Sequence, residues 1–500
     1  MPESESNPQA PLRLGQSALE HLHGVTVPTY DRSALQVGIV HLGVGGFHRS
    51  HQAFYLDALM SRGLAHKQAI CGVGVLERDR EMRDGLTSQD MLYTLTLAHP
   101  DGSRSTQVIG SMIEYLFGPD DPEAVVERMA DPQVTIVSMT ITAAGYKIDP
   151  ATGAFQVDDH EVAHDLAGGV PLTVFPYIVQ ALSTRRSRRI PPFTVMTCDN
   201  LPGNGDCARL AVTSFARAGN PELAKWIEDH VSFPNSMVDR ITPFTTEADR
   251  AELTQRTGII DACPVVSEPF IQWVLQDRFT DSRPPYERVG VTVVDDPGPY
   301  ETMKLRMLNS AHQAMCYVAL LAGHHYVHEA AADPLVVAFL RAYFAREVEP
   351  TMSPVPGLDS THYGEMVLSR FANSQVKDTL ARLGGKSSSA VPTLVFPMVH
   401  ENLVAGRSVR LATAAIAAWA VFCGMTDEDG LSYTRNDPLE EVLLAAAEAS
   451  QADPRQFVTV SGLFGDLSTR SEFVELFVNE VTQIRRDGVG ALIRSLLDDE

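Results

Sequence analysis

Short apolar runs with the pattern of buried strands recur through the first 300 residues. Each run is rich in β-branched or other apolar residues and shows little alternation with polar ones, which is typical of parallel strands covered on both faces. The runs lie at 37–42, 69–75, 133–142, 193–196 and 289–294. A glycine turn and a helical pattern follow the first run, so this part of the chain predicts an open α/β sheet.

The pattern becomes almost entirely helical after a cluster of helix-breaking residues at 295–299. Helices are predicted at about 300–321, 334–349, 364–383, 394–404, 410–423, 438–450 and 471–498. We therefore place a domain boundary near residue 297, with an α/β domain at 14–296 and a helical domain at 297–500. Residues 1–13 are polar and rich in proline and serine, and we expect them to form a disordered tail.

Composition and charge narrow the class of protein. The 500 residues are 44% hydrophobic and 21% charged, as in ordinary soluble globular proteins. A net charge of −23 argues against a nucleic-acid partner or an anionic membrane surface. The six cysteines show no CxxC spacing, and there is no signal peptide or membrane-spanning run, which favours a reducing cytoplasm. We expect a monomer or a small homo-oligomer.

A glycine-rich turn, GVGGFHR at 43–49, follows the first strand and opens a helix. This is the context in which a dinucleotide-binding turn is found. Gly43 would permit the tight turn, and Gly45 would let the backbone approach a pyrophosphate. His48 stands where the third glycine of the fingerprint is expected, so a plain structural turn is the alternative. The candidate cofactor-binding residues are Gly43, Gly45, Gly46, Phe47 and Arg49.

The second strand ends in Glu77-Arg78-Asp79. An acidic residue at this point of a dinucleotide-binding fold accepts hydrogen bonds from the adenosine ribose, which favours NAD. Glu77 and Asp79 are both candidates for that residue. Arg78 would suit the 2′-phosphate of NADP, so NADP is possible but less favoured. The alternative is a solvated turn without a ligand.

Polar residues also follow the strand at 193–196, in the sequence TCDNLPGNG. The carboxyl ends of parallel strands are where open α/β sheets bind ligands. Asn200 lies at such an end and would be able to direct its amide into a cleft. The alternative is that these residues form an ordinary loop without a ligand.

The helix predicted at 300–321 carries Lys304, Asn309 and His312. At about 100° per residue, His312 lies about 80° and Asn309 about 140° from Lys304, on one broad side of the helix. We expect Lys304 in the first turn, near the positive end of the helix dipole, where a lysine loses its proton more readily. A lysine base, an amide and an imidazole would suit proton removal from an alcohol. The alternative is a solvated helix face with three polar residues.

Four separated stretches together resemble the mannitol dehydrogenase family of polyol-specific long-chain dehydrogenases, and within it most of all the mannitol 2-dehydrogenases. They are GIVHLGVGGFHRSHQA, CDNLPGNG, NSMVDRITP and KLRMLNSAHQ, and the resemblance covers nearly the whole chain after about residue 12. It implies a Rossmann-type N-terminal domain, a mostly α-helical C-terminal domain and an active site in the cleft between them.

The resemblance also implies residue roles. Lys304 would be the general base, without zinc, and the motif includes Asn309 and His312. Asn309 and Asn200 would stabilise the alkoxide. Asp239 of the VDR motif and Arg382 of a DTLAR stretch would hold substrate hydroxyls. No metal ligands are expected: His324, His325 and His328 are spaced as surface or packing residues.

Two positions depart from the family pattern. Ala143 stands where relatives carry a glutamate on a proton path. Relatives also place a basic residue in the stretch around Ala390, but residues 387–393 contain none, and Lys386 comes earlier in the loop than the family's position. These departures bear on proton exchange and on recognition of the far end of the substrate.

The expected reaction is D-mannitol plus NAD to D-fructose plus NADH. The alternatives are the same chemistry on D-arabinitol, D-sorbitol or a hexonate such as mannonate, or a non-catalytic nucleotide-binding regulator.

Overall fold

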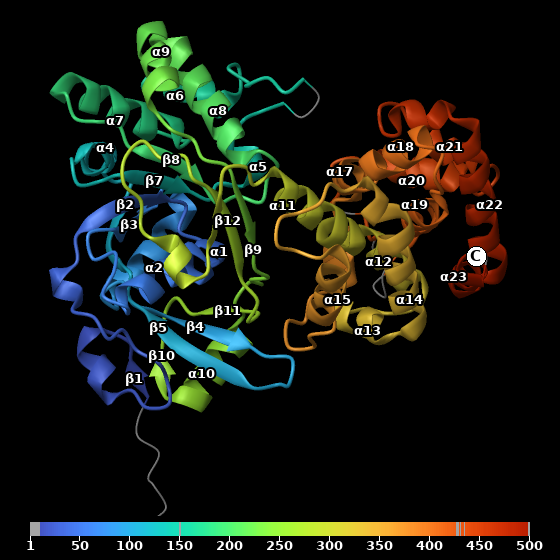
Figure 1. Ribbon diagram of the computed structural model, residues 1–500, viewed down its shortest axis with the longest axis horizontal. Helices are drawn as coiled ribbons and strands as arrows, with labels where there is room; N and C mark the ends of the chain where they lie inside the picture. Colours follow the sequence, from blue (N-terminus) through green and yellow to red (C-terminus); the bar gives the residue numbers. More distant parts are fainter. Residues whose placement is uncertain (1–10, 150–151, 427–429, 431, 435, 499–500) are drawn as a thin grey trace, which may run out of the picture. The chain divides into compact units, whose positions relative to one another are not determined.

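The computed structural model describes residues 11–149, 152–426, 430, 432–434 and 436–498. The chain divides into two compact units, one ending at Gly298 and the other beginning at Pro299, which we call unit 1 and unit 2. In Figure 1 unit 1 is drawn in blue to yellow-green and unit 2 in yellow to red.

A five-stranded parallel sheet forms the centre of unit 1. Its strand order is β6-β3-β2-β7-β8, so that the first strand of this sheet along the chain, β2, lies in the middle. This arrangement confirms the predicted α/β fold. The strands are β2 (Val37–Leu42), β3 (Ala69–Gly74), β6 (Met112–Phe117), β7 (Ile136–Met139) and β8 (Thr194–Thr197).

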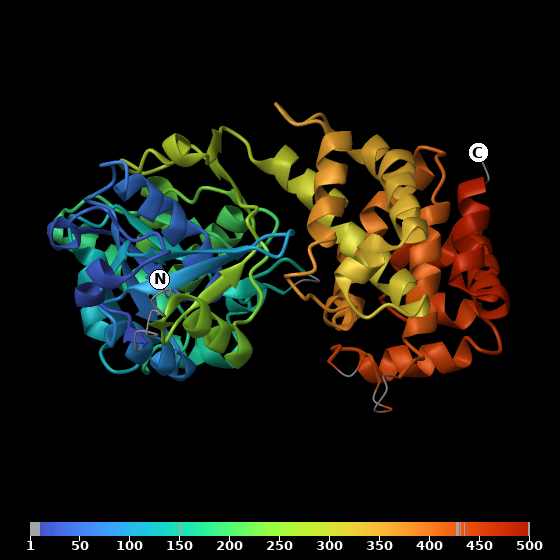
Figure 2. The same ribbon diagram turned by 90° about the horizontal axis from the view of Figure 1, so that it is seen from below.

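Both faces of this sheet are buried, which explains why its strands read as continuous apolar runs. One face packs on α4, α7 and α8 through residues such as Val40 and Leu42, and the other packs on α2 through residues such as Ile39. Figures 1 and 2 show the helices of unit 1 around the sheet. The helices are α1 (Gly46–Ser50), α2 (Gln52–Met60), α3 (Arg80–Thr87), α4 (Pro122–Ala130), α5 (Thr142–Gly145), α6 (His160–Leu166), α7 (Phe175–Arg188), α8 (Asn204–Gly219), α9 (Pro221–His230) and α10 (Glu247–Thr257).

Three smaller sheets complete unit 1, with strand orders β11-β4-β5, β13-β12-β9 and β1-β10. The predicted strand at 289–294 extends too far: β13 begins only at Thr292, and it pairs with β12, outside the central sheet. The predicted tail at 1–13 extends too far, because Leu12 and Arg13 pair with β10; residues 1–10 lie outside the described residues. The strands are β1 (Leu12–Arg13), β4 (Tyr93–Ala98), β5 (Arg104–Ile109), β9 (Ser236–Asp239), β10 (Ile259–Ile260), β11 (Val265–Ser267), β12 (Gln272–Gln276) and β13 (Thr292–Val294).

The carboxyl ends of β2, β7 and β8 meet at one edge of the central sheet. Leu42 is opposite Met139, and Met139 is opposite Thr197. The chain order reverses between β2 and β7, and ligands bind open α/β sheets at such a reversal. The glycine turn after β2 and the loop after β8 are therefore brought together.

Helices make up unit 2, and none of its described residues belongs to a named strand (Figure 2). The predicted helix at 364–383 is two helices separated by residues 372–379, and the predicted helix at 471–498 is broken at Gly488, whose φ of 82° ends α22. The helices are α11 (Gly298–Met303), α12 (Ser310–Leu321), α13 (Val327–Ala332), α14 (Pro334–Tyr343), α15 (Ser360–Phe371), α16 (Leu380–Gly384), α17 (Ser387–Leu394), α18 (Phe396–Val404), α19 (Arg410–Phe422), α20 (Glu440–Ala449), α21 (Arg455–Val458), α22 (Ser471–Asp487) and α23 (Val489–Asp498), with π-helical turns at Lys304–Asn309 and Phe344–Val348.

A buried pair of glutamates lies in the core of unit 2. The Glu347 carboxylate accepts hydrogen bonds of 2.8 Å from the backbone N–H groups of Leu411 and Ala412, in the first turn of α19. Glu480 on α22 is 4% exposed and lies close enough to Glu347 for the two charges to repel. Burial raises the pKa of Glu347 to about 7 and holds the pKa of Glu480 well above its usual range.

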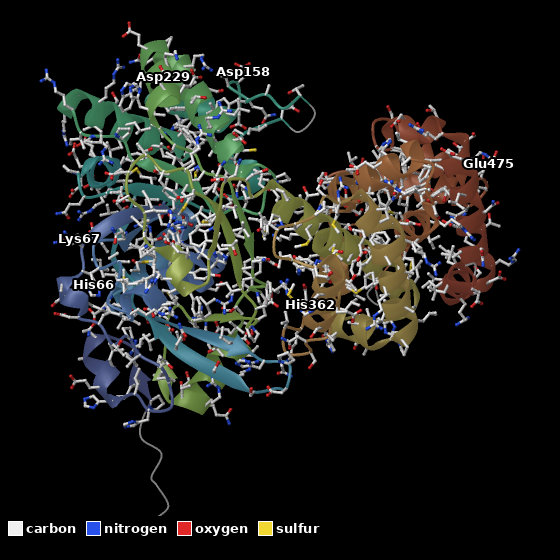
Figure 3. All side chains as sticks on the ribbon, viewed as in Figure 1. His66, Lys67, Asp158, Asp229, His362 and Glu475 are labelled. Carbon is white, nitrogen blue, oxygen red and sulfur yellow. The ribbon has the colours of Figure 1, made fainter. Side chains whose placement is uncertain are left out.

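The surface carries the excess of acidic residues. The charged side chains labelled in Figure 3, including Asp158, Asp229 and Glu475, are exposed. Within the described part of the chain, no helix combines the length and apolar character that crossing a membrane requires.

The buried glutamates predict that the free energy of unfolding falls as pH rises from about 4.5 to 7. Folded Glu347 and Glu480 bind protons more tightly than unfolded glutamates, so their contribution to stability is present below the unfolded pKa and is lost as pH rises. Glu480→Gln removes one of these carboxyls. We expect this variant to have a higher Tm than wild type at pH 8, by about 2–4 °C for each kcal/mol gained.

The matched control is Glu475→Gln, because Glu475 lies on the same helix but is exposed. Thermal unfolding followed by circular dichroism at pH 5 and pH 8 makes the comparison. If Glu480→Gln shows the same difference in Tm between the two pH values as Glu475→Gln, the interpretation of the pair is wrong.

Candidate active site

The helix that carries the predicted catalytic residues changes its hydrogen-bonding register within the motif. Residues Lys304–Asn309 form a π-helical turn between α11 and α12. The backbone N–H of Ser310 donates to the carbonyl of Leu305, five residues earlier, and bypasses the carbonyl of Arg306. A π-helical turn contains more residues than an α-helical one, so Asn309 lies nearer to the side of Lys304 than the predicted 140°.

Two buried hydroxyl groups support this turn. The Ser310 hydroxyl donates to the bypassed carbonyl of Arg306, and the Tyr343 hydroxyl donates to Ser310 Oγ at 3.2 Å. Both side chains are fully buried. Because a buried carbonyl without a donor is unfavourable, these contacts stabilise the wide turn. Sequence analysis missed Ser310, although it lies inside the recognised motif.

Burial, rather than the helix dipole, distinguishes Lys304. The helix begins at Gly298, so Lys304 lies beyond its first turn. The prediction that Lys304 lies in the first turn is therefore wrong. Dipole effects fall off within the first turn. Lys304 is only 4% exposed, whereas Asn309 and His312 are half-buried. The His312 ring stacks on Phe371 of α15, with ring centroids 4.3 Å apart, which fixes the plane of the imidazole.

Salt bridges anchor the neighbouring parts of unit 2. Arg306, inside the π turn, forms a bidentate pair with Glu401 of α18. Arg382 on α16 is bound by Asp378, with Nε to Oδ1 at 2.6 Å, and its side chain is 63% exposed. The Gln313 amide on α12 donates to the Leu383 carbonyl on α16. This hydrogen bond holds α16 against α12 at the residue that follows His312.

The glycine turn of unit 1 is constrained at Gly43 and open at Gly45. Gly43 has a φ of 87°, and a Cβ there would lie 2.3 Å from the Thr140 carbonyl oxygen, so only glycine fits. A Cβ at Gly45 would meet open space, which leaves the backbone accessible to a ligand. One at Gly46 would only touch Thr242.

His48 occupies the position of the third glycine, and its flat ring packs against the strand β2. Its ring stacks on His41 of β2, with centroids 3.4 Å apart. His41 in turn contacts Ser138 Oγ at 2.8 Å. Burial lowers the pKa of His41 to about 3, so this ring is neutral at physiological pH. Two flat neutral rings thus achieve the close contact between helix and strand for which the fingerprint uses glycine.

Phe47 and Arg49 differ in exposure. Phe47 is half-buried and stacks on His51, with centroids 4.8 Å apart. Arg49 is buried, donates to the Cys263 carbonyl and lies over the Tyr93 ring. The structure therefore gives Arg49 internal contacts, and its role in cofactor binding stays a prediction.

The two acids after β3 have different surroundings. Asp79 Oδ2 accepts from the backbone N–H groups of Val75 and Leu76, both at 2.9 Å, and so fixes the end of the strand. Glu77 is exposed and pairs with Arg80. Arg80 also contacts Asp120, an ion pair that sequence analysis missed.

The remaining predicted site residues of unit 1 lie at the ends of strands. Asn200 is exposed in the loop after β8. Asp239 is the last residue of β9 and is 4% exposed. The following Arg240 donates from Nε to the Glu268 carbonyl at 3.1 Å.

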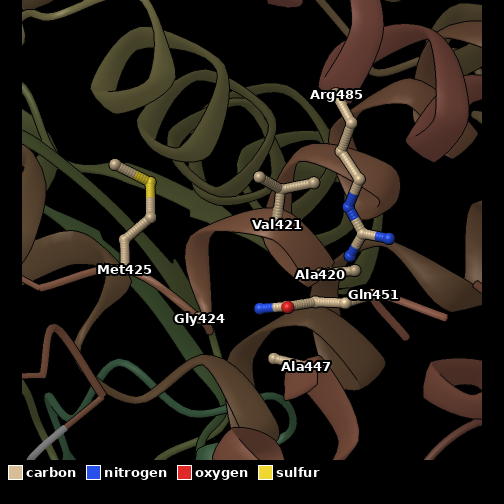
Figure 4. Close-up of a pocket in the computed structure, with 7 residues that line it drawn as sticks. All are labelled: Ala420, Val421, Gly424, Met425, Ala447, Gln451 and Arg485. Carbon is tan, nitrogen blue, oxygen red and sulfur yellow. The ribbon is translucent and has the colours of Figure 1, made fainter. Parts of the chain in front are cut away.

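A separate hollow of about 390 Å³ lies in unit 2 (Figure 4). It contains none of the predicted site residues, so we do not place the active site there. The hollow is lined by Ala420, Val421, Gly424, Met425, Ala447, Gln451 and Arg485.

Comparison with known proteins identifies the family. Residues 37–288 match the model of the mannitol dehydrogenase Rossmann domain, and residues 296–485 match that of the mannitol dehydrogenase C-terminal domain. The chain belongs to the mannitol dehydrogenase family. This membership confirms the resemblance, the Rossmann-type fold with a helical C-terminal domain, and the prediction of a dehydrogenase.

Relatives cover nearly the whole chain. Mannitol 2-dehydrogenase from Phaeosphaeria nodorum is 43% identical over 97% of this chain and 85% of its own length. The enzyme of the same name from Aspergillus fumigatus is 41% identical over 96% of this chain and 98% of its own. A solved complex of Pseudomonas fluorescens mannitol 2-dehydrogenase with NAD and D-mannitol is 42% identical, has a TM-score of 0.88 and covers 98% of this chain and 100% of its own. A substrate-free D-sorbitol dehydrogenase is 36% identical, with the same TM-score, over 96% of this chain and 100% of its own.

The positions that depart from the mannitol dehydrogenase pattern are not buried. Ala143 is exposed in α5, and Ala390 is half-buried in α17. Among the described residues, no group of three His, Cys, Asp or Glu side chains has an arrangement that would hold a metal ion.

The π turn predicts that Ser310→Ala lowers dehydrogenase turnover more than its loss of stability explains. Without the Ser310 hydroxyl, the bypassed Arg306 carbonyl favours a return to the α register, which rotates Asn309 away from Lys304. A displacement of this kind lowers kcat by about ten- to a hundred-fold. Steady-state kcat and the Tm of the variant are the two measurements.

Thr413→Val is the matched control for Ser310→Ala. The Thr413 hydroxyl is also buried and donates to the carbonyl four residues earlier, but on α19. An equal loss of kcat in both variants would contradict a special role for the π turn.

Proposed function

We propose that this protein interconverts D-mannitol and D-fructose with NAD, without zinc, and with Lys304 as the general base. The coarser conclusion is that the chain is an NAD-dependent polyol dehydrogenase. The observation that carries it is identity of 41–43% to mannitol 2-dehydrogenases over nearly the whole chain. The related complex with NAD and D-mannitol supports the choice of cofactor and substrate.

Lys304 is proposed to accept the proton of the substrate hydroxyl. Its burial supports this role, because burial disfavours the charged form of a lysine, and a base must give up its own proton before it can accept one. As the O–H proton moves to Lys304 Nζ, the oxygen becomes an alkoxide and then a carbonyl. The amides of Asn309 and Asn200 are proposed to stabilise the negative charge on that oxygen. His312 is proposed to orient the substrate, because its ring plane is fixed by Phe371.

The turn after β2 fits NAD. Gly43 permits the turn, and Gly45 leaves room for a pyrophosphate against the backbone. Gly46 and Phe47 are proposed to line the same cofactor site, and Glu77 to face the adenosine ribose. When bound, NAD accepts the hydride that leaves the carbinol carbon.

Asp239 and Arg382 are proposed to bind the other hydroxyl groups of the substrate. The Arg382 guanidinium is directed by Asp378 and remains exposed, which suits a polar ligand. The departures at Ala143 and Ala390 leave D-arabinitol and D-sorbitol as alternative substrates. Mannonate is less favoured, because its carboxylate would require a cation and residues 387–393, around Ala390, contain no basic residue. A non-catalytic regulator is disfavoured, since Lys304, Asn309 and His312 are all present.

A panel of polyols tests this proposal. We expect NADH formation, followed by absorbance at alkaline pH, to have its highest kcat/KM with D-mannitol among D-mannitol, D-sorbitol, D-arabinitol and mannonate. A higher value for another polyol would reassign the substrate. Absence of turnover with every member of the panel would overturn the proposed activity.

Replacing the proposed base predicts a large loss. Lys304→Met keeps most of the buried volume but removes the amine, so kcat should fall roughly a thousand-fold or more. The control is Lys225→Met, which removes an exposed lysine paired with Asp229 on α9 and should leave kcat unchanged. Near-normal kcat in Lys304→Met would end the proposed mechanism.

The acids after β3 predict a clear but incomplete preference for NAD over NADP. A carboxylate near the ribose repels the 2′-phosphate, which corresponds to roughly ten- to a hundred-fold in kcat/KM. Because Asp79 also fixes the strand end, the test uses Glu77→Gln together with Asp79→Asn, which retains an acceptor oxygen. We expect kcat/KM with NADP to rise, while kcat with NAD changes little.

Glu114→Gln serves as the control for cofactor choice. Glu114 is another carboxylate paired with an arginine, Arg128, but it lies within β6 rather than after a strand end. Better use of NADP than NAD by the wild-type enzyme would show that an arginine, and not an acid, governs the choice.

A further inference from the structure

The loop that carries Asn200 is held by two buried polar side chains, Asp199 and Asn204. We propose that Asp199 and Asn204 are positioning residues, which fix the backbone on either side of Asn200 so that its amide can act on the reacting oxygen. The inference rests on the role of Asn200 in the proposed function. We call Asp199 and Asn204 the clamp: their hydrogen bonds, at the carboxyl ends of β7 and β8, would hold Asn200 in position.

The Asp199 carboxylate connects two neighbouring strand ends. It accepts from the backbone N–H of Ile141 at 2.9 Å and of Thr142 at 2.8 Å, in the turn that follows β7. It also accepts from the Tyr146 hydroxyl at 2.7 Å. Asp199 is 7% exposed, and burial raises the pKa of its carboxyl. Hydrogen bonds to the carboxylate offset the unfavourable burial of the charge.

The turn held by Asp199 contains a strained residue. Thr142 has a φ of 64°, a left-handed conformation that is uncommon for a β-branched residue. Its N–H is one of the two backbone N–H groups that donate to Asp199. Strain of this kind persists only where surrounding contacts impose it, and it is concentrated at functional sites. The strained turn lies directly beside the loop of Asn200.

Asn204 holds the other side of Asn200. Its amide Nδ2 donates to the backbone carbonyl of Asp199 at 2.9 Å and to that of Ser236 at 2.7 Å. The N–H of Ser236 returns a hydrogen bond of 2.9 Å to Asn204 Oδ1. Ser236 opens β9, the strand that ends in Asp239. Asn204 is 1% exposed.

The clamp therefore joins the loop of Asn200 to the turn containing Ala143 and to the strand containing Asp239. Asn200 itself is exposed and is followed by Leu201-Pro202-Gly203, with Gly203 in the left-handed region at a φ of 57°. Regular secondary structure does not constrain such a loop. A displacement of about 1 Å at an oxyanion-stabilising group costs about a hundred-fold in rate. We therefore expect the loss of the clamp to lower kcat.

A double-mutant cycle tests the proposal. We expect Asp199→Asn to lower kcat for polyol oxidation about ten- to a hundred-fold, while KM for NAD stays within about twofold. In the background of Asn200→Ala, the same substitution should cause no further loss of kcat, because the amide that it positions is already gone. Asn204→Asp, which keeps the acceptor for Ser236 but loses both donated bonds, should behave in the same way.

Asp57→Asn is the matched control. Asp57 is also 7% exposed and accepts from a tyrosine hydroxyl, that of Tyr30 at 2.5 Å, and from a backbone N–H, that of Gly110 at 2.8 Å. We expect Asp57→Asn to lower Tm but not to cause the loss of kcat that is expected for Asp199→Asn. A loss of kcat in Asp199→Asn no greater than in Asp57→Asn, or one that multiplies with that of Asn200→Ala, would overturn the proposal.

Tyrosine variants decide the question if Asp199→Asn does not fold. Tyr146→Phe removes one donor to Asp199 and should lower kcat about two- to tenfold, whereas Tyr30→Phe should not. Equal kcat in the two variants would again overturn the clamp. Failure of the proposed function looks different: the wild-type enzyme would not oxidise any polyol. Full kcat in Asn200→Ala would remove the role of Asn200 and the proposed clamp with it.

Discussion

Buried backbone groups that regular secondary structure leaves without a partner must be hydrogen-bonded, and the candidate site is built around this constraint. The π turn at Lys304 bypasses the carbonyl of Arg306, and Ser310 donates to it. The turn after β7 presents two N–H groups, and Asp199 accepts from both. In each case the polar side chain is needed because the backbone departs from a regular form where chemistry is proposed.

The signals that sequence analysis could use were local. The strand β2 and the turn at Gly43 were predicted because four apolar residues and a glycine pattern occupy adjacent stretches of the sequence. The place of β13 was not predictable, because its pairing with β12 depends on residues that its own sequence does not contain. The register change at Lys304 could not be predicted from the local sequence either, since five of the six residues of the π turn, all except Asn309, are strong helix formers.

The roles of single side chains could also be predicted only where they depend on local sequence. Asn200 was singled out as a residue at a strand end, whereas the bonds from Asp199 to Ile141 and Thr142 span nearly sixty positions and could not be read from the sequence. Helix position and motif resemblance both singled out Lys304, but in the structure this lysine is distinguished by burial and does not lie in the first turn of the helix. His48 looked like a defect in the glycine fingerprint, and its stacking on His41 explains why it is tolerated.

Buried and exposed positions of the candidate site differ in what substitutions can change. Ser310, Asp199 and Asn204 are buried, and replacing any of them leaves a backbone group without its partner, so the geometry around the reacting oxygen changes. Ala143 is exposed and Ala390 half-buried, and neither supports another site residue through a side-chain hydrogen bond. We therefore expect the departure at Ala143 to bear on proton exchange and the departure at Ala390 to bear on recognition of the far end of the substrate, while the groups proposed for proton transfer keep their support.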